Sequence, residues 1–316
     1  MSPGSRSRSL AGVRVGHWTH PSGRTGCTVV LLPDGTVASV EVRGGAPASR
    51  ELELLAPERT VAGADAVVLS GGSAFGLAAA EGVVRYCSEA GRGFPTPGGP
   101  VPIVVGMSLY DLRPGKPPLW PDARAGYEAA SAARSPDGEG PAAGWPVGRI
   151  GAGAGATVGI WRAVRRPGGL GSALLSFETE AGETAVVAAL LAVNAVGDLD
   201  DGSVAGALRR GDFRAPTQPP LGTSTTIGVI CTNVRLSKLE CLLVAQSGHD
   251  GLARALMPAH TRFDGDALVV ASVGDAEAPI DGVRIAATVA VGDAVRAAVT
   301  SGLPSGTSGD QQGPDG

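Results

Sequence analysis

Short apolar runs separated by turns of glycine, proline and aspartate recur along the first third of the chain. Residues 26–43 predict two strands paired as a hairpin around the turn Pro33-Asp34-Gly35. The apolar run 66–69 predicts a strand that leads into the glycine-rich turn 70–73. Positions 74–89 then follow helical spacing. A strand, a glycine turn and a helix are therefore expected in that order.

Strands and helices also alternate in the second half of the chain. Strands are predicted at 173–177, 185–193, 225–232 and 267–273, and helices at 237–256 and 294–300. Ser237 is the expected N-cap of the first of these helices, because its hydroxyl can accept a hydrogen bond from the opening turn. This alternation predicts an α/β protein.

Three segments lack such periodicity. Residues 113–146 are rich in proline, glycine and alanine, and apart from a helical stretch at 123–133 they predict a surface excursion that borders a pocket. Residues 200–224 are polar and proline-rich, as exposed linkers are, and form the strongest internal boundary. Residues 301–316 are expected to be a disordered tail. The rest is expected to form a single domain.

Composition and charge exclude several classes of protein. With 316 residues, 43% of them hydrophobic, the chain can bury a large core. A net charge of −4 argues against nucleic acid and anionic membranes as partners. No apolar run approaches the roughly 20 residues that span a bilayer, and no signal-peptide core follows the polar N-terminus. A soluble, cytoplasmic protein is expected.

The four cysteines are scattered along the sequence. Cys27, Cys87, Cys231 and Cys241 form no C-x-x-C pair and have no histidine at metal-ligand spacing. We therefore expect core thiols, with neither a disulfide framework nor a metal site.

One candidate for chemistry is the segment 222–229, where hydroxyl residues stand at the junction of a long loop and a buried strand. It can be simply a threonine-rich strand start, which the local sequence favours. Alternatively, the chain cleaves itself between Ser224 and Thr225. Thr225 would then be a free N-terminus whose α-amino group acts as the base for its own hydroxyl. Such an amine titrates near pH ~8, so no histidine is needed.

A second candidate is the segment 260–266, in which Asp264 and Asp266 flank a glycine just before a strand. Asp-x-Asp can ligate a divalent metal, but no further acidic residues lie nearby in sequence. A solvated turn is the simpler interpretation, and an anchor for a nucleophile is a third. His249 lies within a predicted helix, where a structural histidine is expected.

The glycine-rich loops give weaker signals. The loop 151–155 satisfies only part of a dinucleotide fingerprint, since it has no strand before it and no helix after it. The turn 70–76 only approximates the nucleophile elbow of serine hydrolases. Asn194 ends an apolar strand, where its amide can cap the strand or donate into an oxyanion hole.

Taken together, ordered segments of the sequence resemble the P1-family peptidases (S58), which include L-aminopeptidase/D-esterases, β-peptidyl aminopeptidases and nylon-oligomer hydrolases. The match spans about residues 12–295. The segments that carry it are 14–17, 25–30, 43–47, Arg50-Glu51, 70–77, 101–104, 168–172, 192–195, 225–229, 249–254 and 260–266. Such a series is more specific than any one motif.

The resemblance implies an αββα four-layer sandwich like that of N-terminal nucleophile hydrolases, and autoproteolysis into an α chain, 1–224, and a β chain, 225–316. By position, Thr225 would be the nucleophile and Asn194 would help form the oxyanion hole. Asp264 and Asp266 would orient the nucleophile, with Thr226 beside it as a secondary hydroxyl. The implied reaction is hydrolysis of an N-terminal aminoacyl amide or ester without a cofactor, in a homo-oligomer of αβ units.

This sequence departs from the family pattern at two positions. Many members carry lysine directly before the Gly-Gly-x-Gly segment, where this chain has Pro167, and commonly asparagine where it has Ser224. A family member that no longer cleaves itself and serves as a binding or scaffold protein is therefore one alternative. Another is an amide hydrolase or acyltransferase of secondary metabolism.

Overall fold

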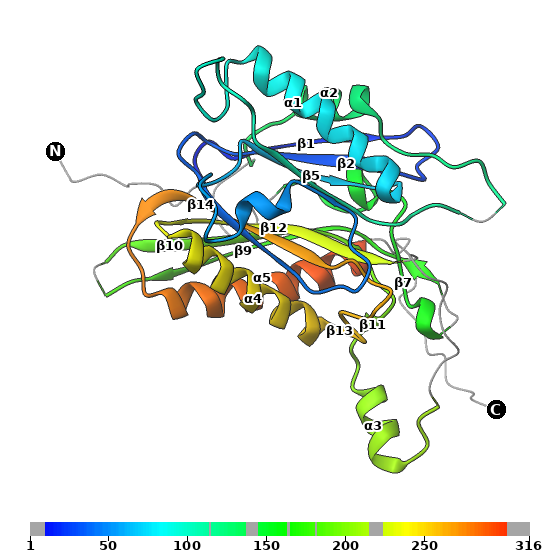
Figure 1. Cartoon of the computed structure of the whole chain (residues 1–316). Coiled ribbons are helices and arrows are strands. Elements are labelled where there is room, and N and C mark those ends of the chain that lie inside the picture. The colour runs from blue at the N-terminus through cyan, green and yellow to red at the C-terminus, as the bar shows by residue number, and fades with distance from the viewer. Residues whose placement is uncertain are drawn as a thin grey trace, which may run out of the picture.

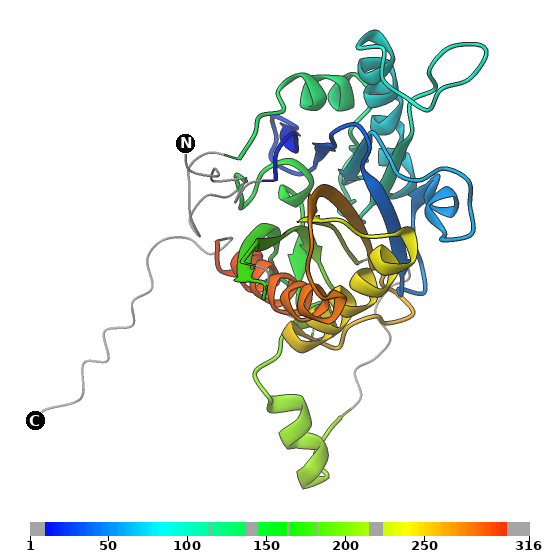
Figure 2. The same cartoon turned by 90° about the vertical axis from the view of Figure 1, so that its left-hand side faces the viewer.

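The computed structural model describes residues 10–113, 115–136, 145–162, 165–180, 182–214 and 224–301. Two five-stranded sheets stack face to face, and a pair of helices covers the outer face of each (Figure 1). The predicted αββα four-layer sandwich is therefore confirmed. In the view turned by 90°, the two helix pairs lie at opposite ends of the stack (Figure 2).

The first sheet has the strand order β1-β2-β5-β6-β4. Its strands are β1 (Arg14–Thr19), β2 (Gly26–Leu31), β5 (Ala66–Ser70), β6 (Val104–Ser108) and β4 (Ser49–Arg50). Helices α1 (Ala79–Glu89) and α2 (Ala123–Ser131) pack on its outer face. The predicted strand–glycine turn–helix unit is thus β5, the short 3₁₀ helix η2 (Ser73–Ala78) and α1.

The second sheet has the order β3-β14-β12-β10-β9. Its strands are β3 (Val37–Val42), β14 (Ala267–Ala276), β12 (Thr225–Val234), β10 (Thr184–Asn194) and β9 (Gly169–Glu178). Helices α4 (Lys238–Ala255) and α5 (Ile280–Ser301) cover its outer face. The central strand β12 runs parallel to β14 and antiparallel to β10.

Several small elements complete the described chain. They are the two-stranded pairs β11 (Asp198–Leu199)–β13 (Leu256–Met257) and β7 (Thr157–Val158)–β8 (Arg166–Pro167), helix α3 (Ser203–Arg210), and the 3₁₀ helices η1 (Leu52–Leu55), η3 (Gly151–Gly153) and η4 (Ile160–Arg162). Within the described ranges, no helix combines the length and the apolar character needed to cross a membrane.

The main core lies between the two sheets. Strand residues alternate between faces, so each strand of the second sheet sends every other side chain inward. Val67 from the first sheet and Leu190 and Val229 from the second are fully or almost fully buried in this layer. Side chains of the opposite parity, such as Ile230 and Leu191, pack under α4 and α5. The cysteines named above are free and buried, as expected.

The predicted hairpin at residues 26–43 is wrong, although both of its strands exist. β2 pairs with β1 and β5 in the first sheet, whereas β3 pairs with β14 in the second. The turn at 33–36 therefore connects the two sheets, and each strand finds its partners far away in sequence. Turn residues alone do not distinguish a hairpin from such a crossing.

Other sequence boundaries also need correction. The predicted linker 200–224 contains α3, and its last residue, Ser224, is buried. The predicted helix 294–300 is only the end of α5, which begins at Ile280. Of the predicted tail, Ser301 ends α5 and residues 302–316 lie outside the described part of the chain. The capping box at Ser237 and Glu240 confirms the predicted start of α4.

Candidate active site

Thr225 is the first residue of β12, at the centre of the second sheet. Side chains along a strand alternate between its two faces, which fixes where the Thr225 side chain points. Ile227 and Val229 point into the core between the sheets, and Thr225 shares their face. Thr226 has the opposite parity and shares the face of Ile230, which packs under the helices. The two adjacent hydroxyls therefore lie on opposite faces of the sheet.

The Thr225 hydroxyl lies against the bond that precedes it. Thr225 is only 4% exposed, and its Oγ1 donates a hydrogen bond to the carbonyl oxygen of Ser224. Ser224 is itself buried, and its hydroxyl has no hydrogen-bond partner among the residues that the structure describes. A potential nucleophile, Thr225 Oγ1, thus contacts the carbonyl group of the buried Ser224–Thr225 peptide bond.

Asn194 lies directly opposite Thr225 in the register between β10 and β12. Side chains of such cross-strand pairs share a face, so the amide projects into the same interior layer as Thr225. Its Oδ1 accepts a hydrogen bond from the backbone N–H of Thr157 at 2.9 Å, and its Nδ2 donates to the carbonyl of Tyr110 at 3.0 Å. The second Nδ2 hydrogen is available to another acceptor.

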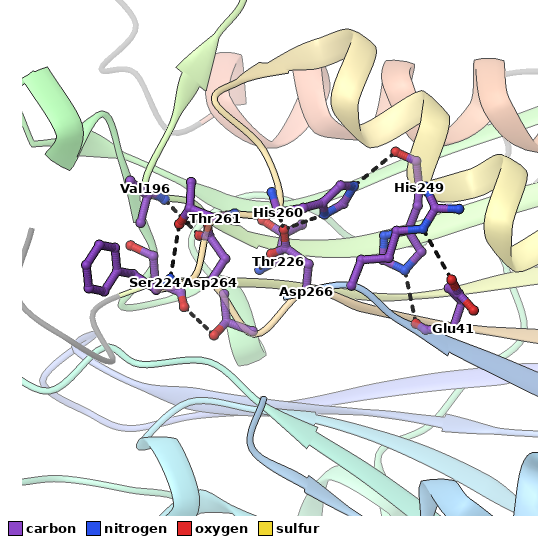
Figure 3. A network of polar contacts seen from close by, with 12 residues as sticks. Glu41, Val196, Ser224, Thr226, His249, His260, Thr261, Asp264 and Asp266 are labelled. Carbon is purple, nitrogen blue, oxygen red and sulfur yellow. Dashed lines mark hydrogen bonds and ion pairs between the residues drawn. The ribbon is translucent and has the colours of Figure 1, made fainter. Parts of the chain in front are cut away.

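Asp264 and Asp266 are 1% and 2% exposed, so the solvated turn expected from the sequence is wrong. Asp264 accepts hydrogen bonds from the backbone N–H of Val196 at 3.1 Å and from the N–H and hydroxyl of Thr261. Asp266 accepts one from the N–H of Thr226 at 2.7 Å. Figure 3 shows the two carboxylates tying the turn before β14 to neighbouring elements.

The carboxylates differ in their partners. The second oxygen of Asp266 accepts hydrogen bonds from the backbone N–H of His260 at 3.1 Å and faces its Nδ1 at 2.9 Å. Burial, and secondly the charge of Asp266, raise the pKa of Asp264 to about 6. The pKa of the buried Asp264 carboxyl is therefore close to neutral pH, whereas the neighbouring Asp266 carboxylate faces the basic side chain of His260.

Close backbone packing brings the Asp264–Asp266 turn onto Thr225. A Cβ atom at Gly265 would lie 2.9 Å from Thr225 Oγ1 and 2.7 Å from the carbonyl oxygen of Ala46. Cβ atoms at Gly44 and Gly45 would equally collide with the backbone of residues 262–266. Glycine at these positions permits the loop after β3, the acidic turn and the threonine to touch.

His249 lies within α4 and is fully buried. Its Nε2 is 3.0 Å from the carbonyl oxygen of Glu41, and burial lowers the pKa of the imidazole to about 4. It is a neutral structural histidine, as the sequence indicates. His260, whose ring meets that of His249 edge-on, was not singled out by its sequence position.

A small polar hollow opens beside Asn194. It is lined by Tyr110, Asp111, Leu112, Arg113, Gly155, Thr157 and Arg165. Tyr110 and Thr157 are the two residues whose backbone holds the Asn194 amide. Of the predicted surface excursion 113–146, Arg113 lines this hollow.

Pro167, which stands where many family members have lysine, pairs with Thr157 across β7 and β8. It therefore lies next to the backbone that holds Asn194. Arg166 forms an ion pair with the buried carboxylate of Asp198, whereas Arg165 lines the hollow. Arg165 thus brings a permanent positive charge to the neighbourhood of the missing lysine.

The acidic turn is arranged to hold backbone rather than a metal. Its carboxylate oxygens face N–H groups, the Thr261 hydroxyl and an imidazole, and no cluster of three or more potential metal ligands occurs among the residues that the structure describes. At one end of β12 the structure brings together Thr225, Ser224, Asn194, Asp264 and Asp266, and Thr226 contributes its backbone N–H.

Comparison with known proteins identifies relatives over almost the whole chain. The family model for peptidase family S58 matches residues 9–310. An uncharacterised aminopeptidase of Mycobacterium leprae is 40% identical over 301 residues, covering 88% of this chain and 81% of that protein. A 6-aminohexanoate-oligomer endohydrolase of Kocuria sp. is 30% identical over 292 residues, covering 85% of this chain and 75% of that protein.

A solved structure shares the fold at lower sequence identity. The L-aminopeptidase D-Ala-esterase/amidase of Ochrobactrum anthropi, described as a variant of the Ntn hydrolase fold, superposes with a TM-score of 0.67 at 20% identity. The match covers 92% of this chain and 84% of that one. The four-layer sandwich described above is thus the Ntn hydrolase fold.

Proposed function

Because the chain belongs to peptidase family S58 and is a hydrolase, we propose that it cleaves itself before Thr225 and then hydrolyses N-terminal aminoacyl amides or esters with the freed threonine. The observation that carries this proposal is the hydrogen bond from Thr225 Oγ1 to the Ser224 carbonyl, at a buried strand start between Asn194 and the acidic turn. The relatives named as an aminopeptidase and as an oligomer endohydrolase support an amide substrate.

Self-cleavage would begin with attack of Thr225 Oγ1 on the Ser224 carbonyl carbon. The C–N bond breaks as the nitrogen takes up the hydroxyl proton, which leaves an ester between Ser224 and the threonine oxygen. Water then adds to the ester, which releases the Ser224 carboxylate and restores the Thr225 hydroxyl beside the amine that the shift has freed. Burial of both residues supports this route, because it holds the reacting atoms in one geometry.

Turnover would reuse the same atoms. The neutral Thr225 amine accepts the proton of Oγ1 as that oxygen attacks the substrate carbonyl, and the proton then passes to the leaving nitrogen or oxygen. The resulting acyl-threonine ester is hydrolysed by water. The free hydrogen of Asn194 Nδ2 would donate to the oxyanion, since the amide lies on the same face as Thr225.

The acidic turn would hold the new N-terminus in place. Asp266 is anchored to the N–H of Thr226, one residue from the amine, and Asp264 braces the turn against Val196. Thr226 therefore acts through its backbone in this proposal, and its hydroxyl faces away.

The mass of the denatured protein tests the proposal directly. We expect the wild type to give two chains, 1–224 and 225–316, and Thr225→Ala to give one. Thr226→Ala is the matched control, because it removes the neighbouring hydroxyl on the opposite face, and it should still be cleaved. Cleaved protein should hydrolyse aminoacyl p-nitroanilides, whereas the Thr225→Ala chain should not.

A single uncleaved wild-type chain without amidase activity would overturn the proposal and favour a binding or scaffold role. Cleavage at another bond would overturn the assignment of Thr225. Amidase activity that survives in the Thr225→Ala variant would show that a different nucleophile acts.

A further inference from the structure

His260 is held at both ring nitrogens by hydrogen-bond acceptors. Its Nδ1 lies 2.9 Å from the Asp266 carboxylate, and its Nε2 lies 3.3 Å from the backbone carbonyl oxygen of His249. A neutral imidazole carries only one N–H, so it can satisfy only one of these acceptors as a donor. Both contacts are hydrogen bonds when the ring is the doubly protonated imidazolium.

The contacts of Asp266 favour the same assignment. Its carboxylate receives the N–H groups of Thr226 and His260 in addition to the ring N–H. Three N–H donors stabilise an ionised carboxylate, so the shared proton belongs on the imidazole. Figure 3 shows His260 between the Asp266 carboxylate and the helix that carries His249.

The charged groups around His260 come from three elements. Asp266 belongs to the acidic turn, His249 belongs to α4, and Arg43 directly follows β3. Arg43 is paired with Glu41 and Asp250, and His249 is neutral. Burial alone lowers the pKa of His260, but Asp266 outweighs burial and raises it above its ordinary value.

We propose that His260, as an imidazolium, is a positioning residue that compensates the charge of Asp266 and so keeps the freed amine of Thr225 unprotonated at neutral pH. The inference rests on the proposed function, since it concerns the amine that self-cleavage creates. It goes beyond that function by assigning the site a resident cation in a chain that has Pro167 where many family members have lysine.

The effect acts over a short distance. The Asp266 oxygen is 2.7 Å from the N–H of Thr226, and backbone bond lengths place the Thr225 nitrogen within about 6.5 Å of that oxygen. An uncompensated carboxylate at that range favours the ammonium form, which has no lone pair to accept the hydroxyl proton. A positive charge on the far oxygen of Asp266 opposes this effect.

The first experiment measures the charge itself. With ¹⁵N-labelled histidine, we expect the two ring nitrogens of His260 to resonate as protonated nitrogens at pH 7, and those signals to vanish in His260→Asn. The sequence has four histidines, so the assignment is tractable. A neutral His260 ring at pH 7 would overturn the inference, whether or not the chain is cleaved.

The second experiment is the pH profile of kcat/KM for cleaved wild type and His260→Asn. Asparagine suits this position because His260 has a left-handed φ of 53°. We expect the acidic limb of the variant to move up by about one pH unit, so that activity on that limb, below the wild-type midpoint, falls about tenfold and recovers in alkaline buffer. His20→Asn, in the loop after β1, is the matched control and should leave the profile unchanged.

The two proposals fail in different ways. A wild type that is neither cleaved nor active contradicts the proposed function. The present inference fails if the wild type is cleaved and active but His260→Asn loses activity by the same factor at every pH. The histidine would then have a merely structural role. If the variant does not fold, the ring resonances of the wild type still decide the charge.

Discussion

The side chain of Asn194 is fixed at both ends, by the Thr157 N–H at its oxygen and the Tyr110 carbonyl at its nitrogen. Asn194→Asp keeps the shape and removes the N–H donor. We expect kcat for an amide substrate to fall by about 10²- to 10³-fold with little change in KM, because an oxyanion donor acts in the transition state. Steady-state kinetics on cleaved protein measure this split.

Asn233, near the end of the neighbouring strand β12, provides the matched control. It is a nearly buried amide that also bonds backbone at both ends, to Val186 and Thr184. Asn233→Asp should cost stability yet leave the kcat of folded enzyme unchanged. An equal loss of kcat in both variants would show a general packing effect and contradict the role of Asn194.

Asp111, in the hollow beside Asn194, makes stability depend on pH. Burial raises the pKa of its carboxyl to about 6, so the native state holds this proton more tightly than the unfolded chain does. The contribution of this carboxyl to stability is therefore greatest below pH ~4 and falls as the pH rises to about 6. Ionisation costs up to about 3 kcal/mol above that range.

Asp111→Asn should remove this dependence. Its oxygen can still accept the hydrogen bond from the Gly72 N–H. In the uncleaved Thr225→Ala background, we expect the variant to be more stable than its parent by about 2 kcal/mol at pH 8 and equally stable at pH 4. Urea unfolding at both pH values checks this, and a difference that is the same at both would exclude Asp111 as its source.

Among the elements, the acidic turn before β14 depends on glycine for its contact with β12. Gly265→Ala places a methyl group 2.9 Å from Thr225 Oγ1 and 2.7 Å from the Ala46 carbonyl oxygen, so the turn and the threonine must separate. We expect self-cleavage to slow on the order of 10- to 100-fold, because small displacements of reacting groups are costly. The mass of the protein at successive times after expression measures this rate.

Gly106→Ala is the comparison for this prediction. Gly106 lies within β6, and a Cβ there would meet its nearest neighbours only at 3.7 Å, an ordinary contact. This variant should be cleaved as fast as the wild type. Normal cleavage of Gly265→Ala would mean that the acidic turn does not need its close contact with Thr225.

The same elements show what the sequence can predict. β5, β10, β12 and the capped start of α4 follow from apolar runs and capping residues, which are local signals. α5 was predicted only at its end, because its buried face consists of small residues such as Ala287 and Ala294 rather than a strong apolar stripe. Its close approach to β9 is set by Gly171, where a Cβ would collide with the Ala294 backbone.

The candidate site was likewise predictable from the sequence only in part. Thr225, Asn194 and the two aspartates stand at strand ends and were candidates on sequence position and family resemblance. His260 was missed as a partner of Asp266, because its charge depends on a carbonyl of α4 that only the tertiary structure brings near. The hairpin error has the same origin, since β2 and β3 take partners in different sheets.

In the molecule as a whole, the proposed cleavage would cut the chain at the centre of a sheet without separating its parts. Chain 225–316 would supply β12, β14, α4 and α5, and chain 1–224 would supply β3, β9 and β10 of the same sheet. Both edges of the β12–β14 pair are thus bonded to the other chain, and the core between the sheets is shared. We expect the two chains to co-elute in native size-exclusion chromatography and to part only in denaturant.

Cleavage should also change how stability depends on concentration. Unfolding of the cleaved protein releases two chains, so each tenfold dilution should lower its apparent free energy of unfolding by about 1.4 kcal/mol more than that of Thr225→Ala, which unfolds as one chain. Denaturant midpoints at several protein concentrations measure this difference. Elution of 225–316 alone under native conditions, or equal concentration dependence for the two proteins, would contradict the shared sheet, because strands bonded on both sides by the partner chain cannot leave without unfolding it.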